Sequence, residues 1–373
     1  IPGLKMSVVA SDGQNIQPVS VDEFRIGVAE TYDVVIEPEV DNAYCIFAQS
    51  IDRTGFTVGN LTSDASLHAP IPPMDPRPVL GHSDMGMDMS DMDMNGMDYS
   101  KMDMGAGDMS GMDHSKMDMG GGDMPSMDHS KMAMGGGDMP GMDHSKMAMG
   151  GGDMPGMDHS KMAMGGGDMS GMDHSKMAMD AAKATVSGLG LAGFGSNNEI
   201  KHIDTEFGPQ VDMRADAPKS GLHDPGIGLR DHQQQFNRKV LTYGDIKGLH
   251  PTYDTRQPSR EIQLHLTGNM NRYMWSVNGV KFMDAAPLEF EYGERLRITL
   301  VNDTMMTHPM HLHGMWSELE TGDADFIPRK HTVLVQPGSK ISYLVTADAK
   351  GQWAYHCHLL FHMPGMFRKV VVK

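Results

Sequence analysis

Near the C-terminus, residues 353–366 have the sequence WAYHCHLLFHMPGM. If this stretch begins as a β-strand, its side chains alternate between two faces. Cys357 then points to one face, and His356 and His358 point to the other. A thiolate with a nearby imidazole from His362 and a thioether is a ligand set that suits a blue-copper site. The two flanking imidazoles would face a second metal site, so one strand would serve both.

A second histidine-rich stretch, residues 308–314 with the sequence HPMHLHG, complements the first. His311 and His313 are two residues apart, so they share one strand face. His308 has odd spacing from them and can point elsewhere, although Pro309 disturbs the count. A lone cysteine near histidines could be a buried thiol beside surface imidazoles. The two stretches together argue against that interpretation. Each places one part of its donors on one strand face and the rest on the other, so together they supply a histidine for the cysteine and several histidines for a second metal centre.

The stretches HPMHLHG and HCHLLFH resemble the two C-terminal copper motifs of multicopper oxidases. The surrounding sequences LTGNMNRYMWSVNG, RLRITLVNDTMMTHPMHLHGMW and GQWAYHCHLL are similar to those of the bacterial copper-resistance members of that family. The resemblance covers residues 238–373 closely and residues 1–80 more loosely. It implies an all-β fold of cupredoxin-type Greek-key sandwiches.

The resemblance also implies which residues bind copper. Type 1 copper would be held by His308, Cys357 and His362, and type 2 copper by His311. The binuclear type 3 pair would take the remaining three histidines of the motifs, His313, His356 and His358. The family's axial methionine usually falls ten residues after the cysteine, where this chain has Phe367. We expect Met366 to take that role, because a phenylalanine side chain cannot ligate copper.

The activity implied by the resemblance is that of an oxidase in copper resistance, located in the periplasm. Cu(I) or a phenolic donor would give electrons to type 1 copper, and Cys357, His356 and His358 would form the path to a trinuclear cluster that reduces O2 to water. That cluster takes eight histidines in the family, and this chain supplies four. No other His-x-His pair occurs in the sequence. We therefore expect an N-terminal domain of about 150 residues to be missing, and this fragment alone to be inactive.

Composition limits the classes of partner. The chain has 373 residues, 40 of them Met, and a formal net charge of −18. Residues 82–180 contain 18 Asp and 6 Lys, so most of the negative charge lies there. The absence of a basic patch disfavours nucleic acid as a partner, whereas metal cations suit this charge.

Two cysteines, Cys45 and Cys357, form no disulfide framework. No run of about 18 apolar residues predicts a membrane span. The chain starts at Ile1 with neither an initiator Met nor a secretory signal, as expected of a fragment or a processed chain.

Residues 82–180 form a 15-residue repeat in which His recurs at positions 114, 129, 144, 159 and 174. The segment contains 28 of the 40 Met and three Gly in most units, so we expect it to be disordered. Thioethers suit Cu(I), and a plain acidic spacer, the alternative interpretation, has no use for so many of them. The accessory Cu(I) ligands would include Met112, His114, Met117, Met119, Met124, Met127, His129, Met132 and Met134.

The two flanking regions are predicted to be β-rich. We expect residues 1–80 to be the C-terminal part of the middle cupredoxin domain, with a small complete β domain as the alternative. Its predicted strands are Met6–Ala10, Phe24–Val28, Tyr32–Ile36 and Ala43–Ala48. Residues 238–373 would form the C-terminal cupredoxin domain, with strands at Glu261–Leu266, Met274–Val277, Leu296–Val301, Thr332–Val335, Lys340–Thr346 and Trp353–His358.

Residues 181–237 are Gly-rich and weakly patterned, and are predicted to be a linker. Its isolated histidines, His202, His223 and His232, would be solvated rather than ligating. His265 lies inside a predicted strand and His331 at the start of one, and both are expected to be structural.

Two other functions remain open at this stage. One is copper sequestration by the repeats without oxidase activity. The other is a two-domain copper enzyme of the nitrite-reductase type, which needs metal ligands on residues 1–80 that the sequence does not show. The predicted partners are copper ions, O2, a small electron donor and other copper-resistance proteins. A metal-loaded site of thiolate and neutral imidazoles should lose its metal at low pH.

Overall fold

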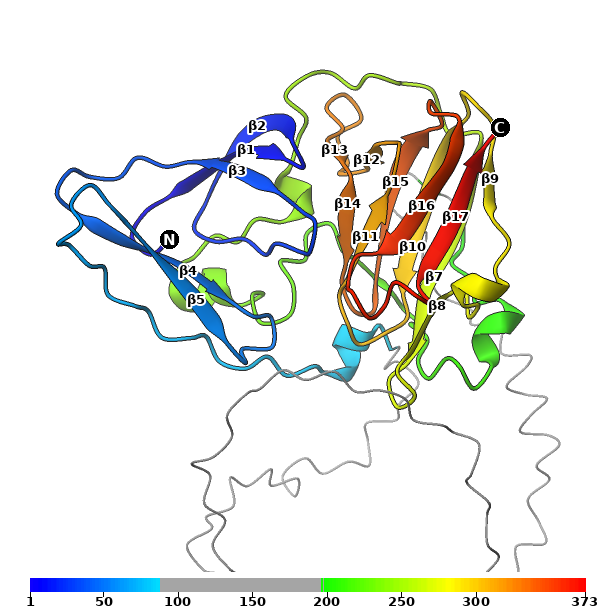
Figure 1. The fold of residues 1–373 in the computed structure, drawn as a ribbon, viewed down its shortest axis with the longest axis horizontal. Helices are drawn as coiled ribbons and strands as arrows, with labels where there is room; N and C mark the ends of the chain where they lie inside the picture. Colours follow the sequence, from blue (N-terminus) through cyan, green and yellow to red (C-terminus); the bar gives the residue numbers. More distant parts are fainter. Residues whose placement is uncertain (88–195, 197) are drawn as a thin grey trace, which may run out of the picture. The chain divides into compact units, whose positions relative to one another are not determined.

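The computed structural model describes residues 1–87, 196 and 198–373 of the chain (Figure 1). These residues belong to one compact unit built mainly of β-strands. Of the segment 82–180, only residues 82–87 are described, and they include the 3-10 helix η1 (His82–Met85). The rest of the repeats, with their predicted Cu(I) ligands, lies outside the described residues. None of the helices in the described part of the chain is long and apolar enough to cross a membrane.

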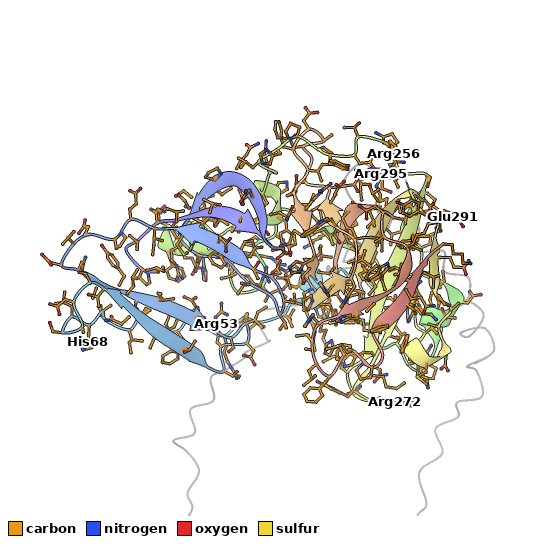
Figure 2. All side chains as sticks on the ribbon, turned by 45° about the horizontal axis from the view of Figure 1, so that its top comes forward. Arg53, His68, Arg256, Arg272, Glu291 and Arg295 are labelled. Carbon is orange, nitrogen blue, oxygen red and sulfur yellow. The ribbon has the colours of Figure 1, made fainter. Side chains whose placement is uncertain are left out.

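The N-terminal part contains five strands. β1 (Met6–Ser11), β2 (Gln14–Val21) and β3 (Tyr32–Val35) form a sheet in the order β2-β1-β3. β4 (Ala43–Gln49) and β5 (Phe56–Thr62) pair as an antiparallel hairpin. His68 follows this hairpin and is exposed (Figure 2).

The strand predicted at Phe24–Val28 is wrong, and β2 was missed. β2 was hidden because polar residues and Pro18 separate its two buried positions, Ile16 and Val21. The apolar residues of 24–28 do not form a strand: Phe24 packs against the N-terminal core, and Ile26 and Val28 are exposed. Gly27 lies so close to Leu334 that an added Cβ would come within 2.3 Å of that side chain. The segment therefore packs on the C-terminal strands instead of joining a ladder.

The C-terminal part is a two-layer β-sandwich (Figure 1). One sheet has the order β13-β12-β15-β10-β7-β8, with β6 (Lys219–Ser220) paired to β15. Its other strands are β13 (Arg329–Lys330), β12 (Ser317–Leu319), β15 (Ser339–Thr346), β10 (Arg295–Asn302), β7 (Arg260–Asn269) and β8 (Met274–Val277). The second sheet has the order β14-β11-β16-β17-β9. Its strands are β14 (Thr332–Val335), β11 (His308–Leu312), β16 (Gly351–Cys357), β17 (Phe367–Val372) and β9 (Leu288–Phe290).

Alternation along β10 explains how the layers hold together. Leu296, Ile298 and Leu300 are fully buried in the core between the sheets. The residues between them face the other side, where Arg297 makes a bidentate ion pair with Glu320. The six strands predicted from sequence in this region are all present, as short runs rich in apolar and β-branched residues between turns predict.

At one end of the same sheet, Arg256 and Arg295 lie close together (Figure 2). Both form ion pairs with Asp254, and Arg295 Nε also donates a hydrogen bond to the Arg256 carbonyl. The outer face of the sheet is therefore polar and well paired.

The segment between the repeats and the sandwich carries short elements and buried side chains. It contains the 3-10 helix η6 (Asp204–Phe207) and the helix α2 (His232–Phe236), and η7 (Tyr243–Asp245) follows it. The prediction that His202 and His232 are solvated is wrong, since both side chains are buried against carboxylates. His223 is exposed, as predicted.

A buried ion-pair cluster links the N-terminal part to the sandwich. Lys330 is fully buried, and its ammonium lies 3.0 Å from Asp12 Oδ2 and 3.2 Å from Glu30 Oε1. The same Asp12 oxygen accepts hydrogen bonds from the backbone N–H groups of His331 and Thr332. These contacts fix the start of β14, which pairs with β11, the strand that carries the first histidine motif.

Candidate metal centre

Strands β11 and β16 bring the two histidine-rich motifs side by side. They pair antiparallel, with Met310 opposite Cys357 and His311 opposite His356. Because side chains alternate along a strand, Cys357 enters the core between the sheets while His356 lies on the outer face. The parity predicted from the sequence is thus the parity of the structure.

On the inner face, three side chains form a compact group that we call the cysteine site: His308, Cys357 and His362. Cys357 Sγ lies 3.6 Å from His308 Nδ1 and 3.7 Å from His362 Nδ1, and the two nitrogens are 3.2 Å apart. All three residues are buried, with exposures of 0%, 0% and 2%. Three such donors facing one point are the trigonal set of a blue-copper site. The residues present therefore fit copper.

Hydrogen bonding fixes which nitrogen of His308 faces the sulfur. The Thr304 hydroxyl donates to Asn302 Oδ1 at 2.8 Å, so its oxygen is left to accept a hydrogen bond. His308 Nε2 lies 2.6 Å from that oxygen and donates to it. In this tautomer Nδ1 carries the lone pair and points at Cys357, which is the orientation that metal binding needs.

His362 is held by an aromatic neighbour. The Trp275 indole stacks on its imidazole with ring centroids 3.7 Å apart and an interplanar angle of 21°. The loop after Cys357 can approach Trp275 this closely because residue 365 is glycine. A Cβ at Gly365 would lie 1.9 Å from the Trp275 carbonyl oxygen.

Met366 and Phe367 lie on opposite sides of the strand. Phe367 pairs with His356 and stacks on its ring at 5.6 Å, so it belongs to the outer face. Met366 is fully buried, and its carbonyl accepts a hydrogen bond from the Cys357 N–H at 3.0 Å. Alternation then directs Met366 to the inner side with Cys357.

Burial shifts the pKa values of the cysteine site. It lowers the pKa of His362 to about 4, and it holds the pKa of His308 well below its ordinary value, with a further contribution from the charge of His362. Both imidazoles are therefore neutral at neutral pH and can donate a lone pair. Burial raises the pKa of the Cys357 thiol to about 12. A metal that binds here must displace that proton.

On the outer face, four imidazoles gather in what we call the four-histidine group: His311, His313, His356 and His358. The closest nitrogens are the two Nε2 atoms of His313 and His356, 3.1 Å apart. The ring of His311 lies 4.6 Å from that of His313, and His356 lies 5.3 Å from His358. The group is partly open to solvent, with His313 exposed and only His356 buried.

Backbone carbonyls orient two members of this group. His311 Nδ1 donates to the His331 carbonyl at 2.7 Å, and His356 Nδ1 donates to the Cys357 carbonyl at 3.0 Å. Each Nε2 is then free to ligate. Burial lowers the pKa of His311 to about 4 and also lowers that of His356, so both rings are neutral at neutral pH.

Three contributors were not found from the sequence: Thr304, Trp275 and the His331 carbonyl. Thr304 lies four residues before His308, a spacing that carries no signal on its own. Trp275 comes from β8, far away in sequence, and only the fold brings it to His362. The His331 carbonyl is a backbone atom and has no sequence signature.

Family comparisons agree with this architecture. Models of the multicopper oxidase family match residues 1–67 and 255–373. The chain belongs to the multicopper oxidase family, and its sandwich is of the cupredoxin type.

Individual relatives narrow the position within the family. The chain is 52% identical over 374 residues to copper resistance protein A of Escherichia coli, an alignment that covers 100% of this chain and 53% of that protein. It is 52% identical over 375 residues to copper resistance protein A of Pseudomonas syringae pv. tomato, with the same coverage. A multicopper oxidase of Mycobacterium tuberculosis is 36% identical over 106 residues, covering 28% of this chain and 21% of that protein. The chain spans about half the length of the copper-resistance relatives it matches.

Proposed function

We propose that this chain provides the type 1 copper site, and half of the histidines for an oxygen-reducing copper cluster, in an oxidase of copper resistance. His308, Cys357 and His362 would hold type 1 copper, with Met366 as the axial ligand. His311 would bind type 2 copper, and His313, His356 and His358 the type 3 pair. When bound, copper at the cysteine site supplies one-electron redox chemistry. The observation that carries the proposal is the position of Cys357 between two histidines of the opposite face.

The covalent connection gives the chain its own role in electron transfer. Cys357 is bonded through the backbone to His356 and His358, so the thiolate of one site and two imidazoles of the other share a short through-bond route. The hydrogen bond from His356 Nδ1 to the Cys357 carbonyl, 3.0 Å long, adds a contact along that route. Because the thiolate and the imidazoles belong to adjacent residues of one strand, electron transfer between the two sites would need no conformational change.

The surroundings of the cysteine site prepare its donors. The Thr304 oxygen holds the His308 tautomer, and Trp275 fixes the plane of His362. Burial keeps both imidazoles neutral and excludes water from the thiolate. A site whose donors are already oriented loses little energy to rearrangement when it changes oxidation state.

For the longer protein of which the copper-resistance relatives are examples, we propose the oxidation of Cu(I) or a phenolic donor coupled to the reduction of O2 to water. The four-histidine group is half of the set that the family resemblance implies, so the other four ligands would come from outside this chain. A periplasmic location follows from the same resemblance. We further propose that residues 82–180 capture Cu(I) for this site.

The test is the visible absorption of the 373-residue chain after copper loading, in wild type and in two variants. The wild type and His313→Gln should show the intense absorption of a thiolate–Cu(II) bond, and Cys357→Ser should not. Thermal melting of the three metal-free proteins controls for folding. Copper that binds to a folded wild-type chain without this absorption contradicts the assignment of the cysteine site.

Oxygen uptake by a longer protein that contains this chain tests the second half of the proposal. With Cu(I) as donor, Cys357→Ser should abolish uptake while leaving the copper capacity of the repeats unchanged. Uptake no greater than that of free copper would instead favour sequestration as the function.

A further inference from the structure

A second group of potential metal ligands lies in the same sandwich, away from both copper motifs. It consists of His202, Glu206, His265 and Asp303, which we call the His202–His265 cluster. Each residue offers one ligand atom, and all four atoms lie within 4.8 Å of one another. Glu206 belongs to η6, His265 to β7, and Asp303 follows β10. The cluster therefore joins three separate segments of the chain.

The four atoms form a ring in which nitrogen and oxygen alternate. His202 Nδ1 lies 2.7 Å from Glu206 Oε2 and 3.5 Å from Asp303 Oδ2. His265 Nδ1 lies 3.4 Å from Glu206 Oε2 and 2.8 Å from Asp303 Oδ2. Metal–ligand bonds of about 2.0–2.2 Å place neighbouring ligand atoms about 3 Å apart. The spacing of the ring thus suits a four-coordinate cation at its centre.

The charge of the cluster also calls for a cation. The carboxylates of Glu206 and Asp303 are both fully buried. Within the part of the chain that the structure describes, neither carboxylate forms an ion pair with a lysine or an arginine. Buried carboxylates without a compensating positive charge are unfavourable. A divalent cation among the four donors would neutralise both of them at once.

A similar group elsewhere in the chain differs in its charge balance. His232 lies against Glu23 and Asp75, again two carboxylates and an imidazole. There Arg238 pairs with both carboxylates, at 3.4 Å from Glu23 and 2.8 Å from Asp75. An arginine thus supplies the positive charge that the His202–His265 cluster lacks.

Hydrogen bonds leave lone pairs directed into the cluster. His202 Nε2 is 3.3 Å from the Ala215 carbonyl and donates to it, so in the neutral ring Nδ1 presents a lone pair to Glu206. Asp303 Oδ1 accepts from the Ala215 N–H at 2.8 Å, which orients Oδ2 toward His265. Among the described residues, His265 Nε2 and Glu206 Oε1 are buried and have no hydrogen-bond partner.

A route to the cluster exists from the surface. A hollow of about 320 Å³ is lined by Glu206 and His265, together with Lys201, Ile203, Gln263 and Asn278. Two of the four cluster members thus line a hollow, while His202 and Asp303 lie behind them. Oriented donors are one of the features that distinguish a metal site from a chance cluster.

We propose that the His202–His265 cluster binds one divalent cation that prefers nitrogen and oxygen donors, such as Zn²⁺. Two imidazoles and two carboxylates form a borderline-to-hard set, distinct from the thiolate-containing cysteine site. The cation ties η6 and β7 to Asp303. Asp303 is adjacent to Thr304, whose hydroxyl oxygen contacts His308, so the bound ion steadies the loop that leads to the cysteine site.

Zinc content after equilibrium dialysis of the full chain tests the proposal. We expect His202→Gln and His265→Gln to bind one equivalent of Zn²⁺ less than wild type. His232→Gln is the matched control, since it changes a buried histidine beside two carboxylates in the arginine-paired group, and its zinc content should equal that of wild type. Equal zinc content in all four folded proteins overturns the proposal.

A measurement on the wild type keeps the proposal testable if a variant fails to fold. Crystals of the full chain grown with Zn²⁺ should give an anomalous difference peak at the zinc edge, within about 2.2 Å of the four donor atoms. A map with zinc elsewhere and none among these four residues contradicts the proposal.

Discussion

The two faces of strand β16 carry groups of very different completeness. On the inner face, His308, Cys357 and His362 are buried and lie 3.2–3.7 Å apart. On the outer face, the two closest donor atoms of the four-histidine group are equally near, at 3.1 Å, but His313 is exposed and only His356 is buried. One site is enclosed by this chain alone, and the other has an open side.

Adjacent residues of one strand can therefore lie in different environments and have different roles. Alternation puts neighbours on opposite faces, so the environment of each face can be set independently. The inner face excludes water and makes the thiolate strongly dependent on metal. The outer face leaves its imidazoles partly open to solvent. Any experiment that affects the two faces equally would argue against this division.

The largest expected effect is a difference in copper affinity between two single variants, each of which removes one histidine from one face. His308→Gln should weaken copper binding at the cysteine site by more than about 100-fold, since it removes a direct ligand, whereas changes to supporting residues cost 10–100-fold. His313→Gln should leave that site unchanged. Copper titration followed by thiolate absorption measures both. Equal losses in the two variants would show that the faces are not independent.

Acid should destabilise the metal-free chain through the inner face. Burial lowers the pKa of His362 to about 4, while the unfolded chain titrates near the ordinary value of 6.5. Above that value both states are neutral, and below it the unfolded state takes up protons first. The free energy of unfolding therefore falls as pH falls from about 6.5 to about 4, by about 2 kcal/mol for this residue at pH 5.

Urea unfolding at pH 7 and pH 5 measures this loss. The free energy of unfolding of His362→Gln should fall less between pH 7 and pH 5 than that of wild type. The corresponding fall in His313→Gln should be closer to the wild-type value. If His362→Gln loses as much unfolding free energy between pH 7 and pH 5 as wild type, His362 is not the cause of the acid sensitivity.

A smaller effect is expected from the hydrogen bond that orients His308. Thr304→Val keeps the shape of the side chain and removes the oxygen that accepts from Nε2. Copper affinity at the cysteine site should fall about 10-fold, with the thiolate absorption retained at saturating copper. Thr304→Ser keeps the hydroxyl that contacts His308 and serves as the control. An unchanged affinity in Thr304→Val would mean that burial alone orients the ring.

The smallest effect should follow substitution of Met366, the proposed axial ligand. Met366→Leu is nearly isosteric, so the buried volume is kept. Copper should still bind with its thiolate absorption, and the reduction potential of the site should shift, because the axial ligand tunes it. Met363→Leu, in the same loop, should leave the potential unchanged. Identical potentials in wild type and Met366→Leu would assign Met366 to packing only.

Much of the C-terminal sandwich could be predicted from sequence because its strands are short runs rich in apolar and β-branched residues between clear turns. Asn278 and Gly279 both have positive φ, as expected of the Asn-Gly turn at this position. The turn is a local feature, so single-sequence reasoning reaches it. The grouping of His308, Cys357 and His362 was expected from the family resemblance, and strand parity agrees with it.

Other features depend on contacts between distant segments. β2 has polar residues between its buried positions, and its pairing with β1 decides its structure. His202 and His232 lie in stretches without periodicity, and they are buried only because Asp303 and Glu23 come from elsewhere in the chain. Trp275 reaches His362 through the fold alone. Tertiary contacts of this kind leave no mark on the local sequence.

The most direct test of the division between the two faces is X-ray absorption at the copper edge, on the chain loaded with one equivalent of Cu(II). We expect one short sulfur scatterer and two nitrogen scatterers, and loss of the sulfur in Cys357→Ser. A shell of nitrogen and oxygen only, unchanged in Cys357→Ser, would show that copper prefers the open face, and it would contradict the assignment of Cys357 as the ligand on which the other claims depend.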